Sequence, residues 1–115
     1  MASAGTKRVR HVKQSIVAIR VILAGRTLEQ AHQDRVLWLA FERSLEMLSE
    51  ASRHIPAEWK LDFPGIPWRQ VGDLGNALRH AYHDLDALAL WTIYEHDLAP
   101  LEAAIDAMLA AHDLS

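Results

Sequence analysis

The 115-residue chain contains no cysteine, and that absence excludes a disulfide scaffold, a thiolate zinc site and a cysteine nucleophile. Its five glycines and four prolines are too few for a turn-rich all-β chain or for low-complexity sequence. No window of about 18 consecutive apolar residues is present, so the sequence predicts no transmembrane segment. We therefore expect a single soluble cytoplasmic domain that is long enough to bury one hydrophobic core.

Charge is distributed unevenly along the chain. Residues 1–35 carry seven Lys or Arg against two acidic residues, a balance of +5, whereas the other 80 residues carry five basic against thirteen acidic side chains, a balance of −8. Such a basic segment can contact phosphate or pair with an acidic face of a partner subunit. We expect residues 1–8 to form a flexible basic tail and residues 9–115 a single helical domain. Arg20 interrupts the first apolar stretch, so this segment does not resemble a signal peptide.

Apolar residues recur at helical spacing through most of the chain. The first stripe ends before Gly25, and the second ends at Pro56 and can begin after either Thr27 or Asp34. Residues 56–66 contain two prolines and one glycine, which is typical of a loop. No segment alternates with period two. The sequence predicts an all-α fold, an up-and-down bundle of four to five helices.

The last two predicted helices are bounded by proline and aspartate. Pro67 suits the first position of a helix, where its missing N–H is not needed. Asp84 and Asp86 are both plausible N-caps of the next helix. Pro100 lacks the donor that helix continuation requires, so we expect that helix to kink or restart near Asp97.

Histidine is frequent, with seven copies, three of them followed by aspartate, but the pattern does not predict a metal site. Two of these His-Asp pairs lie near predicted helix ends, where aspartate caps and histidine faces water. Paired Glu-x-x-His motifs, typical of di-iron bundles, are absent. No glycine-rich phosphate loop is present either. We therefore predict neither a metal ion nor a cofactor.

A polar cluster in residues 74–86 is the strongest candidate site. Asn76 and His80 are four residues apart and would share one helix face, which Asp84 would extend. Gly75 and Arg79 share the neighbouring strip by the same spacing. Grouped Asn, Arg and His side chains suit phosphate binding and proton transfer, although a solvated helix face has the same composition.

Residues 63–109 resemble the HepT-like branch of the HEPN superfamily. The family's Ile-Pro-Trp opens a helix, here residues 66–68, and that helix ends in Arg-Asn-x-x-x-His-x-Tyr, here residues 75–82. A segment that begins with aspartate and contains tryptophan follows, here Asp86 to Trp91, and then Asp-Leu-x-x-Leu, here residues 97–101. Upstream, residues 43–51 resemble the family's long helix that ends in Glu-Ala.

This resemblance implies a metal-independent endoribonuclease, the toxin of a type VII toxin–antitoxin system whose antitoxin is a nucleotidyltransferase. Two copies of the motif would meet in a homodimer and form one cleft for RNA. His80 would take the catalytic histidine position and Asn76 the adjacent motif position. Tyr82 matches the tyrosine that the partner modifies with AMP, and a bulky anion there would repel the RNA phosphate.

The sequence departs from the family at the arginine, whose position is occupied by Gly75. Loss of one charge-stabilising donor typically lowers a rate by about 10²–10³-fold. One interpretation is a catalytically inactive binding module that docks a nucleotidyltransferase and is AMPylated on Tyr82. A second is that Arg79, one turn along, reaches into the vacated space. A third is that the glycine is an engineered substitution.

Overall fold

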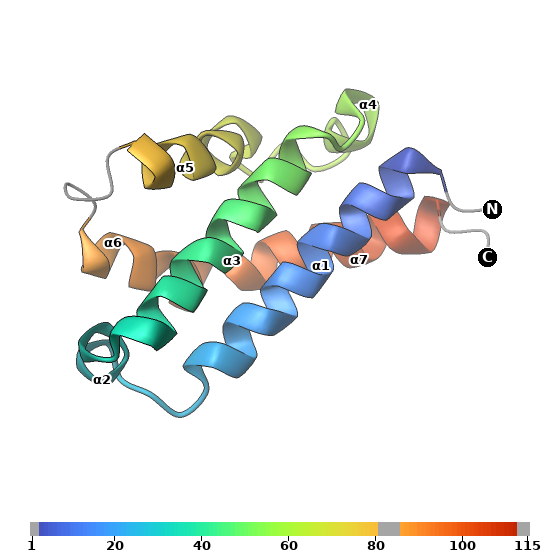
Figure 1. The fold of residues 1–115 in the computed structure, drawn as a ribbon. Coiled ribbons are helices and arrows are strands. Elements are labelled where there is room, and N and C mark those ends of the chain that lie inside the picture. Colours follow the sequence, from blue (N-terminus) through green and yellow to red (C-terminus); the bar gives the residue numbers. More distant parts are fainter. Residues whose placement is uncertain (1–2, 81–85, 113–115) are drawn as a thin grey trace.

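The computed structural model describes residues 3–80 and 86–112, and within these ranges all the regular secondary structure is helical, with short turns and loops between the helices (Figure 1). Four long helices form the bundle: α1 (Ala4–Leu23), α3 (Arg35–Arg53), α5 (Trp68–His80) and α7 (Leu98–His112). Between them lie α2 (Leu28–Gln33), α4 (Ala57–Lys60), α6 (Ala87–Thr92) and a π-helical turn, η1 (Ile93–Asp97). The predicted all-α bundle is confirmed.

Polar residues fix where the helices begin. Both candidate starts of the second predicted helix are used, because Thr27 caps α2 and Asp34 caps α3. Asp86 caps α6 through its contact with the Leu88 amide. Ser3 caps α1, so residues 4–8, which we expected in a flexible tail, belong to that helix instead. The first helix begins this close to the N-terminus because the Ser3 side chain accepts a hydrogen bond from the Thr6 amide.

The hydrophobic core lies where α1 packs against both α3 and α7. Ile16, Phe41 and Ile105, one from each of these helices, are completely buried. Helix α3 lies between α1 and α5, and α3 is the main packing partner of α5 (Figure 1). The position of α5, which carries the predicted site, therefore depends on its contact with α3.

The irregularity expected near Asp97 takes the form of the π-helical turn. The Leu98 amide donates to the Ile93 carbonyl, five residues back, instead of continuing the four-residue pattern. Pro100 has no N–H to donate to the His96 carbonyl. The ladder is thus already interrupted at this point, and the chain accommodates the interruption by widening one turn before α7 begins.

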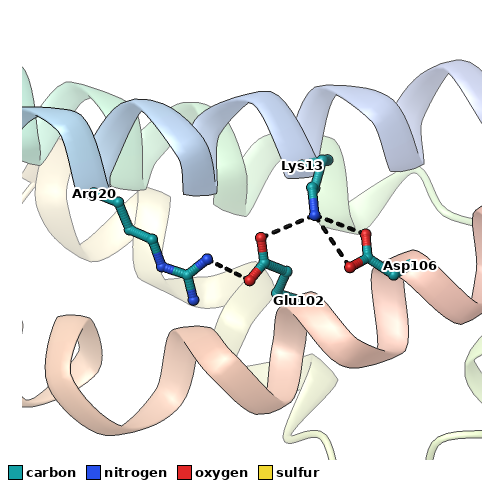
Figure 2. Close-up of polar contacts among 4 residues, drawn as sticks. All are labelled: Lys13, Arg20, Glu102 and Asp106. Carbon is teal, nitrogen blue, oxygen red and sulfur yellow. Dashed lines mark hydrogen bonds and ion pairs between the residues drawn. The ribbon is translucent and has the colours of Figure 1, made fainter.

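Two ion-pair partners on α1 hold α7 in place (Figure 2). Lys13 Nζ lies 2.9 Å from Glu102 Oε2 and 2.8 Å from Asp106 Oδ1, and Arg20 pairs with the other oxygen of Glu102. Hydrogen bonds from Arg20 and then Lys13 lower the pKa of Glu102. Part of the basic N-terminal charge is therefore neutralised within the chain, by its own acidic C-terminal helix.

Candidate functional site

Helix α5 presents a small, close-packed face to α3 and a polar face to solvent. Pro67 precedes its first residue, and the Trp68 indole N–H donates to the Phe63 carbonyl at 3.1 Å, which ties the start of the helix to the preceding loop. Gly72, Gly75 and Leu78 are buried. The predicted site residues Asn76, Arg79 and His80 are all exposed on this helix.

Ser49 of α3 fixes the contact between the two helices. Its Oγ accepts a hydrogen bond from the Gly75 amide at 2.8 Å and donates one to the Gly72 carbonyl at 3.0 Å. The hydroxyl therefore bonds to the backbone ladder of α5 itself, which requires a very close approach of the two helices. Two glycines three residues apart permit that approach because neither carries a Cβ.

Gly75 is part of this packing. A Cβ at residue 75 would lie 3.0 Å from Ser49 Oγ and 3.2 Å from Ser49 Cβ. Ser49 is fully buried and bonded on both sides, so it has little freedom to move. An arginine at this position would therefore require a small shift of the serine that holds α5 on α3. Sequence reasoning missed Ser49, and the Gly72–Gly75 spacing was the only signal that pointed to it.

The Arg79 guanidinium lies over Gly75. Its Nη1 is 3.4 Å from the position that a Cβ at residue 75 would occupy. Among the described residues, Arg79 has no ion pair within 4 Å. Its charge is one of the smaller contributions that lower the pKa of Glu50, after the main one, a hydrogen bond with His54.

Arg79 also lines a groove on the outer surface between α1 and α3, with a cavity volume of about 530 Å³. We call this the α1/α3 groove. Arg8 and His11 line it from α1, and Arg43, Met47 and Glu50 line it from α3. Arg79 thus connects the end of α5 with a mixed polar and apolar surface formed by two other helices.

The structure does not bring all predicted site residues together in one chain. Asn76 and His80 are exposed, but neither lines the groove that contains Arg79. Successive residues diverge by about 100° around a helix, which is why Arg79 and His80 point in different directions. Tyr82 and Asp84 lie outside the described residues. A single chain therefore offers the arginine and the histidine on two neighbouring faces of α5.

Residues 3–80 and 86–112 form neither a cluster of metal-ligating side chains nor a membrane-spanning helix. No group of three or more His, Cys, Asp or Glu side chains there could hold a metal ion. No helix in the same ranges has the length and apolar character needed to cross a membrane.

The described residues form a small all-α domain with exposed Asn, Arg and His side chains at the end of α5. The family model described as "Ribonuclease HepT-like" matches residues 12–108. The chain therefore belongs to the HepT-like ribonuclease family of the HEPN superfamily.

Curated relatives carry ribonuclease names. The chain is similar to "Putative RNase MJ1380" of Methanocaldococcus jannaschii, with 32% identity over 64% of this chain and 67% of that protein. It is also similar to "Probable ribonuclease HepT" of Thermococcus cleftensis, with 34% identity over 64% of this chain and 66% of that protein. A longer match, at 26% identity, covers 88% of this chain and 90% of "Putative RNase TTE0752" of Caldanaerobacter subterraneus subsp. tengcongensis. No solved structure matches the chain.

Proposed function

We propose that this protein is a metal-independent endoribonuclease. In this proposal Arg79 stabilises the charge on the reacting phosphate in place of the family's arginine, whose position Gly75 occupies. One observation carries the proposal: the Arg79 guanidinium lies over Gly75, 3.4 Å from the position of a Cβ there. A guanidinium that reaches back one turn can put its charge near the space where the family's arginine side chain starts. The ribonuclease family and the names of the relatives support the same activity.

The proposed reaction is cleavage of RNA by its own 2′-hydroxyl. The 2′-oxygen attacks the adjacent phosphorus while one His80 accepts the hydroxyl proton, and the bond to the 5′-oxygen of the next nucleotide breaks. His80 of the partner subunit donates a proton to that leaving oxygen. Arg79 stabilises the negative charge that develops on the phosphorane oxygens. The products are a 2′,3′-cyclic phosphate and a free 5′-hydroxyl.

A homodimer is proposed because one chain lacks a complete site. Arg79 and His80 lie on different faces of α5, so a second copy is needed to supply the opposing histidine. A suitable apolar surface is present on α1 and α3, where large hydrophobic side chains between 47% and 79% exposed face outward: Val17, Val21, Val36 and Leu39. Burial of such side chains is the main favourable contribution to association.

The family resemblance supports a further assignment, to the toxin half of a type VII toxin–antitoxin system in the cytoplasm. In this proposal a cognate nucleotidyltransferase is the antitoxin, and it AMPylates Tyr82. The alternative is an inactive binding module that docks the nucleotidyltransferase and is modified on Tyr82 without cleaving RNA. The absence of an arginine at residue 75 favours this alternative, and the position of Arg79 favours the nuclease.

The experiment that tests the nuclease is RNA cleavage by the purified chain in excess EDTA. We expect cleavage to persist at the rate seen without chelator, because the proposed proton transfers and charge stabilisation use only side chains. The products should carry 2′,3′-cyclic phosphate and 5′-hydroxyl ends, identified by mass spectrometry. Activity that disappears with chelation, or products with 5′-phosphate ends, would contradict the proposed mechanism.

A further inference from the structure

We propose that the α1/α3 groove binds the RNA strand through phosphates that flank the one being cleaved. The inference rests on the proposed function and extends it from the reacting atoms to the path of the substrate. Arg79 lines the groove, and Arg79 is also the residue assigned to the reacting phosphate. A strand whose reacting phosphate contacts Arg79 can therefore continue along the groove between the two long helices.

The charges that line the groove leave two arginines available to an anion. Arg43 Nη1 pairs with Glu46 Oε1 at 2.8 Å, so these two side chains largely neutralise each other. Arg8 and Arg79 have no ion pair within 4 Å among the described residues. Two guanidinium groups without a close ion pair in one concave surface are suited to phosphate, which arginine binds through two parallel hydrogen bonds.

Glu50 carries a negative charge that counteracts the attraction of these arginines for phosphate. It lines the same groove, and its hydrogen bond with His54, at 3.1 Å, keeps its pKa lowered and the carboxylate ionised. A fixed negative charge there repels an approaching phosphate. Loss of Arg8 and loss of Glu50 should therefore change RNA binding in opposite directions.

The size and remaining lining of the groove also suit a nucleotide strand. Its volume of about 530 Å³ falls in the range of ordinary ligand sites. Met47, 52% exposed, and Ala18 supply apolar surface for a ribose or base, and the Ser44 hydroxyl is a further hydrogen-bond donor. Contacts of this kind carry no base code, so binding should be independent of RNA sequence.

The test is binding of a fluorescein-labelled hexauridylate to the full chain, followed by fluorescence anisotropy at several KCl concentrations. His80→Ala is the reference background, so that the probe is not cleaved. Adding Arg8→Gln is expected to weaken binding about tenfold, because one charged hydrogen-bonding contact is lost. It should also reduce the slope of log K against log salt by about 0.7, the value for one contact with a single strand. Adding Glu50→Gln should strengthen binding about threefold.

Arg26→Gln is the matched control, since it removes the same charge just beyond the C-terminal end of α1, whereas Arg8 lies near the start of that helix. Arg26 does not line the groove and is expected to leave hexauridylate binding unchanged. If Arg8→Gln and Arg26→Gln bind alike, or if Glu50→Gln weakens binding, the groove is not the RNA path, for example because an acidic protein occupies it. If the unmodified chain nevertheless cleaves RNA, the proposed nuclease activity stands and only the proposed binding of RNA in the groove is wrong. If Arg8→Gln weakens and Glu50→Gln strengthens hexauridylate binding but the unmodified chain cleaves no RNA, the groove binds RNA and the proposed nuclease activity is wrong.

Discussion

Replacing His80 with alanine is expected to lower the rate of RNA cleavage by about 10²–10⁴-fold, the usual contribution of a side chain that transfers protons in the transition state. In a dimer the substitution removes both the proton acceptor and the proton donor, so we expect the upper part of that range. The measurement is single-turnover cleavage of a defined RNA by the purified variant. Because His80 is exposed, the variant should fold and unfold like the original chain.

His96→Ala is the control for this prediction. His96 is also exposed, but it lies in η1, on a different helical element from the proposed site. Its replacement should leave cleavage unchanged. Equal activity of His80→Ala and the unmodified chain would remove His80 from the mechanism, and with it the reason for expecting a composite cleft.

Replacing Arg79 with alanine is expected to lower cleavage by about 10²–10³-fold, as when one donor to a developing oxyanion is removed. Arg79→Lys should restore only part of the rate. Lysine keeps the positive charge but lacks the planar pair of donors that matches two phosphate oxygens. The effect should fall mainly on the single-turnover rate at saturating RNA, because the charge that Arg79 stabilises develops in the transition state.

Arg69→Ala provides the matched control on the same helix. The Arg69 side chain is 94% exposed, and its one ion pair, with Asp73, is long at 4.0 Å. Loss of this charge should change cleavage far less than loss of Arg79. If His80→Ala is inactive while Arg79→Ala is fully active, Arg79 does not replace the missing arginine. If the unmodified chain itself does not cleave RNA, the inactive binding module is the better interpretation.

Restoring arginine at residue 75 would not give an equally clear answer. A side chain there meets Ser49, whose hydroxyl bonds to the α5 backbone at Gly72 and Gly75. Any change in activity would combine a new charge with a shift of the helix that carries His80. This packing also gives Gly75 a structural role of its own, independent of any lost catalytic function.

Local sequence patterns predicted the helices well because their signals are local. Thr27 and Asp34 were competing candidates for one helix start, and the chain uses both because two short-range caps can act on two successive helices. Pro100 likewise predicted an irregularity near Asp97. The proline alone does not specify the form of this irregularity, a π-helical turn in which the Leu98 amide donates to the Ile93 carbonyl.

The candidate site was harder to predict because it depends on contacts between distant residues. Helical spacing predicts that Arg79 and His80 diverge by about 100° around the axis. It does not predict which of the two side chains faces α3. That choice follows from Ser49, 26 residues upstream of Gly75, which fixes the face of α5 that is buried. The basic N-terminal segment is similar: its charge was evident, but pairing of Lys13 and Arg20 with α7 spans more than 80 residues.

The most direct test of the account is the distance between the two copies of residue 80 in solution. The chain has no cysteine, so His80→Cys and Glu58→Cys each accept one spin label per chain. Glu58 lies in α4, at the opposite end of α5 from residue 80 (Figure 1). Double electron–electron resonance should give one narrow distance between labels at residue 80, shorter than the distance between labels at residue 58. A distance at residue 80 that exceeds the distance at residue 58, in samples that sediment as dimers, would contradict a cleft shared by the two histidines.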